Sequence, residues 1–298
     1  GKKYKLTLKF REPKFAASNI YWDNTAQKLT FAPYSETPSL VPENQYQGIF
    51  FKFGSLIGMS PKDNGNSSTT PLFVPPTRSG GYGTWYITSA DGSLTTAGLP
   101  SELADSPVYN HINENGTLWT GTNYDAIPYA IGGVVRTTPD ESYSDRYVID
   151  MPADSLAEFK GDICKYINPL YRLPMAYEFG SFGTAQWDPN PNIGWTKVGT
   201  PWDLVTSDQA DGTYINTNNT GAKYGWTENF FPASGYRSAV WEVHEAGSSG
   251  RYWSGSIEGS GEPNRTNVYC LYFTSIQMNA TSSVGRKNGF PVRCILQE

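Results

Sequence analysis

Three cysteines, Cys164, Cys270 and Cys294, carry the most obvious covalent chemistry in this sequence. They are too few for a scaffold built on disulfides, and they lack the short paired spacing of a zinc site. At most one disulfide can form. The residues alone leave open the alternative of three buried free thiols.

Outside the cysteines, few residues in the sequence indicate a metal site or a catalytic nucleophile. The two histidines, His111 and His244, exclude a metal site built from several imidazoles. The sequence has no zinc-protease, phosphate-loop, dinucleotide or nucleophile-elbow motif. We therefore predict no catalytic residue and no cofactor. One enzyme class stays open, a glycoside hydrolase, because 28 Asp and Glu residues allow many carboxylate pairs.

An oxygen-rich stretch, residues 203–219, is the one segment that could bind Ca²⁺. It contains Asp208, Asp211 and Asn216, whose side-chain oxygens are the ligands that Ca²⁺ prefers. The stretch lacks an EF-hand pattern, and a solvated loop is the simpler interpretation.

Four tryptophans lie in or beside loop sequence rich in Gly, Pro and Asp, and we predict that they bind a ligand: Trp187, Trp195, Trp202 and Trp226. Aromatic rings exposed on loops can stack against sugar rings or dock a protein partner. The competing interpretation places them in the core.

The composition describes a loop-rich globule. Of 298 residues, 38% are hydrophobic, 14% aromatic and 17% charged, so rings supply much of the buried area. The net charge of −5, with no basic cluster beyond Lys2 and Lys3, argues against a nucleic-acid partner. No apolar run approaches the ~20 residues that a membrane-spanning helix needs.

Short strand signals separated by turn residues fill the first half of the chain. The alternation in Lys3–Phe10 predicts a half-buried strand. Further strands are expected at 19–22, 28–31, 48–53, 71–74 and 84–88.

The pattern changes near residue 150. Apolar spacing predicts a helix over 152–168, capped by Asp154 or Ser155, and a second helix over 174–182 with Pro174 in its first turn. Loops are expected over 187–224, and strands at 237–243, 252–256, 268–275 and 290–296. The change fits a boundary between a β-rich region, 1–150, and a second domain, 151–298, or an elaboration of one domain.

Four blocks in the second half resemble, in order, motifs of the Fibrobacter succinogenes major paralogous domain, a relative of the formylglycine-generating enzyme. They are GDICKYIN (161–168) with YRLPMAYEFGSF (171–182), FPASGYR (231–237), RYWSGS (251–256), and NVYCLYF (267–273) with NGFPVRCI (288–295). The resemblance implies an α+β chain: irregular N-terminal β structure followed by a C-type-lectin-like domain with two short helices and short antiparallel strands.

The same resemblance implies roles for particular residues. Cys164 and Cys294 match the long disulfide of C-type-lectin-like folds, with Cys270 as the competing partner for Cys294. Arg172, Glu178, Arg237 and Arg293 could pair as partly buried ions that order the fold. Tyr252, Trp253, Tyr269, Leu271 and Phe273 are expected in the core. The enzyme's pair of redox cysteines and its copper site lack a counterpart here, which argues against oxidase activity.

These observations predict a non-enzymatic, exported cell-surface binding or adhesion module. A surface glycan, a surface protein or pilus subunits are the expected partners. We expect it on the extracellular face of the outer membrane, held only by a lipid anchor on residues that precede Gly1. The alternative is a carbohydrate-binding surface protein of a glycan-uptake system.

Overall fold

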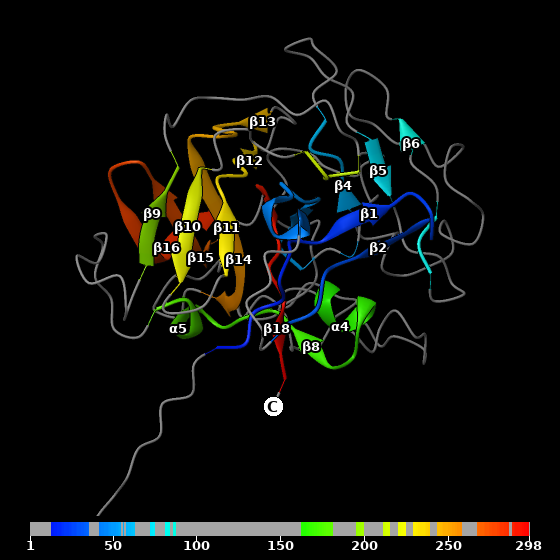
Figure 1. Ribbon diagram of the computed structural model, residues 1–298, viewed down its shortest axis with the longest axis horizontal. Coiled ribbons are helices and arrows are strands. Elements are labelled where there is room, and N and C mark those ends of the chain that lie inside the picture. The colour runs from blue at the N-terminus through cyan, green and yellow to red at the C-terminus, as the bar shows by residue number, and fades with distance from the viewer. Residues whose placement is uncertain are drawn as a thin grey trace, which may run out of the picture.

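The chain consists mainly of short strands. The computed structural model describes residues 13–35, 42–54, 56, 58–62, 72–74, 81–83, 86–87, 162–180, 195–199, 211–214, 220–224, 229–238, 243–257, 267–285 and 288–297. The regular elements among these residues are mostly strands, with a few short helices. The fold is therefore α+β or mainly β (Figure 1). In this part of the chain, no helix is long and apolar enough to cross a membrane.

Among the described residues, the N-terminal part contributes six strands and one short 3-10 helix. They are β1 (Tyr21–Asp23), β2 (Lys28–Thr30), η1 (Pro42–Gln45), β3 (Phe50–Lys52), β4 (Gly58–Met59), β5 (Leu72–Val74) and β6 (Tyr86–Ile87). Five of these strands match predicted ones. Strand β4 was missed because its two residues carry no alternating pattern.

The C-terminal part contributes two helices and eleven strands among the described residues. They are α4 (Ile163–Ile167), β8 (Tyr171–Arg172), α5 (Ala176–Phe179), β9 (Trp195–Val198), β10 (Gly221–Tyr224), β11 (Phe230–Pro232), β12 (Tyr236–Arg237), β13 (Val243–His244), β14 (Ser249–Ile257), β15 (Asn267–Thr274), β16 (Met278–Gly285), β17 (Gly289–Pro291) and β18 (Ile295–Leu296). The prediction of loops throughout 187–224 is wrong at β9 and β10.

One sheet joins the two ends of the chain. Its strand order is β13-β12-β17-β3-β4-β5-β6, and antiparallel pairing of Phe51 with Phe290 places β3 beside β17. An isolated bridge also pairs Phe15 with Ile295. Described residues from both halves therefore share a sheet. The predicted Lys3–Phe10 strand and the proposed boundary near residue 150 lie outside the described residues.

Two clusters of buried hydrophobic residues, both rich in aromatic rings, form the core of the part that the structure describes. In the larger one, Trp253 stacks on Phe290 with ring centroids 4.0 Å apart and donates its indole N–H to the carbonyl of Phe51 at 2.6 Å. In the smaller one, Phe15 packs against Phe179 and Phe231. Large rings supply these contacts because the chain has few long aliphatic segments to bury.

Helix α4 begins later than predicted. Its N-cap is Asp162, whose carboxylate accepts hydrogen bonds from the backbone N–H groups of Cys164 and Lys165. Asp162 itself is extended, so the helix cannot run unbroken from Asp154 or Ser155, both of which lie outside the described residues.

Helix α5 is also shorter than predicted. It begins at Ala176 after an extended N-cap, Met175, so Pro174 precedes the helix instead of occupying its first turn. The backbone N–H of Met175 donates to Glu178 at 2.7 Å. This side-chain acceptor fixes where the helix starts.

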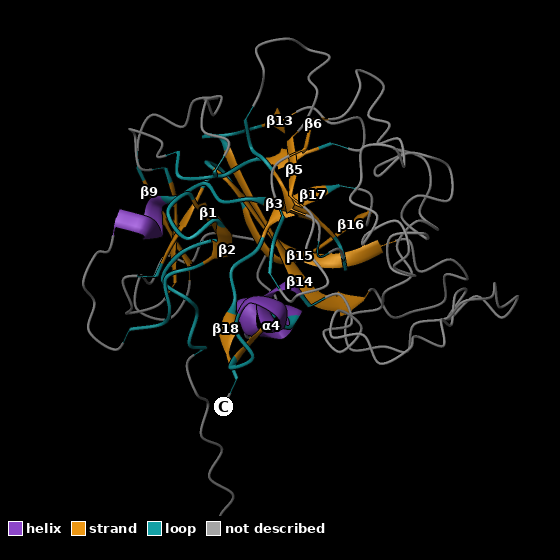
Figure 2. Ribbon diagram, turned by 90° about the vertical axis from the view of Figure 1, so that its right-hand side faces the viewer, coloured by secondary structure: helices purple, strands orange, loops and turns teal. Residues whose placement is uncertain are grey.

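A disulfide joins Cys164 in α4 to Cys294 immediately before β18, which confirms the predicted pairing. Their Cα atoms are 5.6 Å apart across a sequence separation of 130 residues. Figures 1 and 2 both show α4 beside β18. The disulfide therefore fastens the first described helix of the second half to the end of the chain.

Candidate functional site

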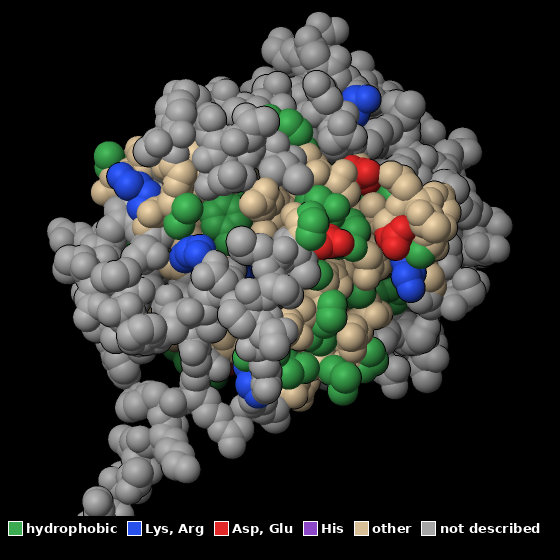
Figure 3. Space-filling view, in the orientation of Figure 1, with side chains coloured by type: hydrophobic (Ala, Val, Ile, Leu, Met, Phe, Trp, Pro, Cys, Tyr) green, Lys and Arg blue, Asp and Glu red, His purple; other side chains and the backbone are tan. Residues whose placement is uncertain are grey.

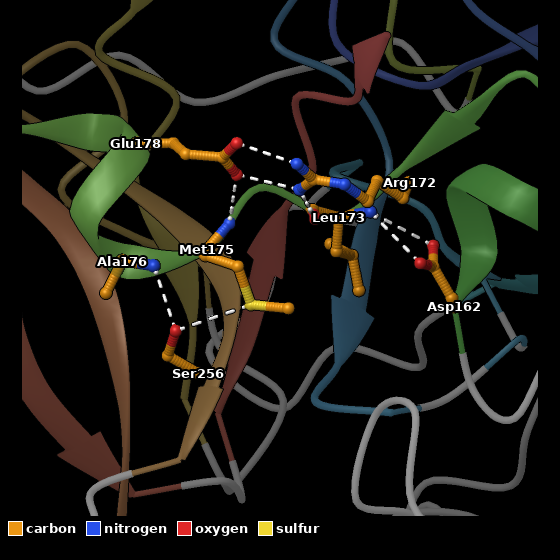
Figure 4. A network of polar contacts seen from close by, with 7 residues as sticks. All are labelled: Asp162, Arg172, Leu173, Met175, Ala176, Glu178 and Ser256. Atoms are coloured by element: carbon orange, nitrogen blue, oxygen red, sulfur yellow. Dashed lines mark hydrogen bonds and ion pairs between the residues drawn. The ribbon is translucent and has the colours of Figure 1, made fainter. Parts of the chain in front are cut away.

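The Arg-Leu-Pro segment and its glutamate form a closed polar network (Figure 4). Both Nη atoms of Arg172 donate to Glu178, one to each carboxylate oxygen, at 2.7 Å. Glu178 also accepts the N–H of Met175, and Arg172 donates to the carbonyl of Leu173 at 3.0 Å. The predicted ion pair is confirmed. Its groups bond one another and the backbone, which is the arrangement of a structural pair.

Asp162 extends this network on its other side through Leu173. Its carboxylate accepts the N–H groups of Cys164, Lys165 and Leu173, so it connects α4 to the segment after β8. Burial raises the pKa of Asp162 to about 6, although these backbone hydrogen bonds act in the opposite direction.

Arg237 and Arg293 are completely buried instead of partly buried. Arg237 donates to the carbonyls of Ser60 and Lys62. Arg293 donates to Asn19 Oδ1, to the carbonyl of Ala16 at 3.0 Å and to that of Phe230 at 2.8 Å.

The expectation of an ion pair is wrong for Arg293, because its partners are neutral oxygens. Its guanidinium also lies 4.6 Å from the centroid of the Phe231 ring. Burial lowers the pKa of Arg293 to about 10. From within the core, Arg293 therefore joins its own segment to residues 16–19 and to Phe230.

Cys270 is a buried free thiol. Burial raises its pKa to about 12, which keeps it protonated and therefore a poor nucleophile.

The predicted tryptophan site is largely outside the described residues, which do not include Trp187, Trp202 and Trp226. The backbone of Trp195 lies in β9, opposite Tyr224, and not in a loop. A strand position there was missed because the surrounding Gly, Pro and Asp residues are typical of loops.

The predicted Ca²⁺ segment is described only around Asp211. One carboxylate oxygen of Asp211 accepts the amide of Asn24 at 2.8 Å, and the other accepts the N–H and the hydroxyl of Thr213. Asp208 and Asn216 lie outside the described residues. Figure 3 shows carboxylates beside hydrophobic side chains over β1 and β2. Among the described residues, no group of His, Cys, Asp and Glu could hold a metal ion.

A row of polar and aromatic side chains runs across five strands, with one side chain from each of β13, β12, β14, β15 and β16. We call it the Tyr–Arg row, and its members are His244, Tyr236, Arg251, Tyr272 and Asn279. Register pairs His244 with Tyr236, Arg251 with Tyr272, and Tyr272 with Asn279. A parallel bridge between Gly235 and Gly250 places Tyr236 beside Arg251. All five members are partly exposed.

Arg251 lies at the centre of this row between two tyrosines. Its guanidinium carbon is 4.3 Å from the ring centroid of Tyr236 and 4.5 Å from that of Tyr272. The rings of His244 and Tyr236 stack with centroids 5.3 Å apart. Such cation–π contacts hold the guanidinium in place, and Arg251 as a whole stays partly exposed.

Glu245 adds a carboxylate at the edge of the row. Its Oε2 lies 3.4 Å from Nη2 of Arg251 and accepts the hydroxyl of Ser249 at 2.6 Å. The side chain of Glu245 is 40% exposed and that of Arg251 is 19% exposed. Nε of Arg251 is buried and has no hydrogen-bond partner in the part of the chain that the structure describes. Because the single contact with Arg251 is long, the exposed carboxylate of Glu245 keeps hydrogen-bonding capacity beyond Arg251 and Ser249.

The backbone at Glu245 is held in an uncommon conformation. Its φ is 58°, in the left-handed region that favours glycine or asparagine. The carbonyl of Glu245 accepts the N–H groups of Ser248 and Ser249, which closes the turn before β14. This turn aims the carboxylate at Arg251.

Burial raises the pKa of Tyr236, and the charge of Glu245 adds to that shift while Arg251 opposes it. The phenol is therefore neutral near pH 7 and can both donate and accept a hydrogen bond.

The sequence did not reveal the Tyr–Arg row. Tyr269 was expected in the core, but it is partly exposed, as is Tyr272. A register shift between Cys270 and Tyr272 buries Cys270 and Leu271 in succession, which breaks the simple alternation. Weak signals were present, since His244, Glu245 and Arg251 lie close together in sequence.

The comparisons with known proteins find no family model, curated protein or solved structure that matches this chain.

Proposed function

We propose that this chain is a non-enzymatic, exported cell-surface binding or adhesion module with a C-type-lectin-like second half. The observation that carries the binding role is the Tyr–Arg row. It places a partly exposed Arg–Glu pair and two tyrosines on a sheet framework. Enrichment in Tyr and Arg is typical of the energetic centres of binding surfaces.

The disulfide supports export. A bridge between Cys164 and Cys294 persists in an oxidising compartment and is rare in a reducing cytosol. It also supports the fold assignment, because it joins the same two blocks, GDICKYIN and NGFPVRCI, that the family resemblance pairs. In this proposal a lipid anchor holds the protein on the extracellular face of the outer membrane.

The partners proposed are a surface glycan, a surface protein or pilus subunits. A carbohydrate-binding role in glycan uptake is the second candidate, and it is favoured by the adjacent donor and acceptor in Arg251 and Glu245. Both candidates use the same row.

Protease treatment of intact cells that produce the protein, followed by thiol labelling of the purified, denatured chain without reductant, tests the export. We expect cleavage from outside the cell and one labelled thiol, Cys270. Three labelled thiols, or cleavage only after lysis, would contradict export.

Attachment of protein-coated beads to cell layers tests the binding role. Saturable attachment that Tyr272→Leu abolishes supports the proposal, and beads that attach no better than beads coated with an unrelated protein contradict it.

A further inference from the structure

We propose that the Tyr–Arg row, together with Glu245, binds a neutral pyranose sugar. This inference rests on the proposed binding function and names the class of ligand for its site. It starts from the pair of Arg251 and Glu245, which places a fixed donor 3.4 Å from a fixed acceptor.

Neighbouring hydroxyl groups of a pyranose match this pair. One hydroxyl can donate to the carboxylate of Glu245 while the next accepts from a guanidinium N–H of Arg251. The capacity for these bonds exists because the present contact between the two side chains is single and long.

The charges of the site favour a neutral ligand. The positive charge of Arg251 and the negative charge of Glu245 compensate each other. A carboxylate, sulfate or phosphate approaching Arg251 would also meet the half-exposed carboxylate of Glu245, and like charges repel at this distance. A sugar hydroxyl meets no such opposition.

The flanks of the pair suit the apolar edges of a sugar ring. Tyr236 and Tyr272 lie on either side of Arg251, and their rings are partly exposed. Exposed Gln277 donates to the hydroxyl of Tyr272 at 3.3 Å, and Asn279 lies opposite Tyr272 on β16. Apolar walls with a few placed polar groups are the usual composition of a small-ligand site.

The groups are already held in place. Two rings fix the guanidinium of Arg251, and the hydroxyl of Ser249 fixes Glu245. A side chain added at Gly250 would collide with the ring of Phe273, so β14 packs tightly beside Arg251. Little side-chain freedom is lost on binding, which favours even a small ligand.

Titration of the full chain with methyl glucoside, methyl galactoside, methyl mannoside and glucuronate, followed by NMR, tests this inference. We expect saturable binding of at least one neutral glycoside, with Kd on the order of 1 mM, and at least tenfold weaker binding of glucuronate.

Two variants remove parts of the site. Glu245→Gln keeps the shape but removes the charged acceptor, and Tyr272→Leu removes one flank; each should weaken binding at least tenfold. Tyr177→Leu is the matched control, because Tyr177 is 69% exposed on α5 and outside the row. It should leave Kd within twofold. Thermal unfolding of each variant shows whether it folds.

Binding that both site variants leave unchanged, tighter binding of glucuronate, or no saturable binding of any sugar would overturn the inference. The bead-attachment assay distinguishes a failure of the sugar-binding inference from a failure of the proposed binding function. Attachment without sugar binding refutes the ligand class alone, whereas loss of both refutes the binding role as well.

Discussion

Two arginine–glutamate pairs in this protein have the same spacing in sequence but differ in their hydrogen bonds and in the exposure of the glutamate. Arg172 and Glu178 are six residues apart, as are Glu245 and Arg251. The first pair makes two bonds of 2.7 Å, and its glutamate also accepts a backbone N–H. The second makes one contact of 3.4 Å, and its glutamate is 40% exposed.

In the proposed function, this difference in hydrogen bonding separates a structural pair from a ligand-binding pair. In the first pair the carboxylate of Glu178 accepts three hydrogen bonds from the protein, which leaves it little capacity for a ligand. In the second pair, stacking between tyrosines holds the arginine, and the one long contact to Glu245 leaves part of the pair's hydrogen-bonding capacity unused. Composition and charge are the same in both cases.

The largest expected effect is on the framework around the first pair. Replacing Cys164 and Cys294 together by alanine removes a bridge across 130 residues. On the chain-entropy estimate this should lower the free energy of unfolding by about 4 to 5 kcal/mol. Urea denaturation measures the loss. A loss below about 1 kcal/mol would mean that the bridge does not constrain the unfolded chain.

Asp162 gives the framework a dependence on pH. Because burial raises its folded-state pKa from 3.8 to about 6, its contribution to stability is complete below pH 3.8 and is lost as pH rises through about 6. Relative to Asp162→Asn, the wild type should therefore lose up to about 3 kcal/mol between about pH 4 and pH 7. Urea denaturation of both proteins across this range checks it, and parallel curves would contradict it.

Matched substitutions in the two pairs sharpen the comparison directly. Glu178→Gln removes charge from a saturated pair and should destabilise the protein by about 2 kcal/mol. Glu245→Gln changes a half-exposed carboxylate with one long contact to Arg251 and should cost less than about 0.5 kcal/mol. Thermal and chemical unfolding of both variants measure the contrast. Equal losses would show that the two pairs play the same role.

The sequence predicted the framework better than the candidate site. The disulfide, the Arg172–Glu178 pair and the nine predicted strand segments that overlap described strands were accessible because motif order and local alternation encode them. Helix starts were misplaced because Asp162 and Glu178 act through hydrogen bonds to backbone that propensity does not reveal.

The Tyr–Arg row depends on pairing between distant strands. Tyr236 and Tyr272 meet Arg251 only because β12, β14 and β15 become neighbours, and the register shift in β15 alters which side chains are exposed. No local pattern in the sequence carries that information. The loop tryptophans, by contrast, were easy to notice and lie mostly outside the described residues.

The most direct test of this account is the retention of the purified protein on an array of neutral glycans, compared with Glu245→Gln and Glu178→Gln. We predict saturable retention of the wild type. Glu245→Gln should lose this retention although its thermal stability is unchanged. Glu178→Gln should keep it at temperatures below its own, lowered unfolding temperature. Retention that survives Glu245→Gln, or that follows stability alone in both variants, would contradict the account.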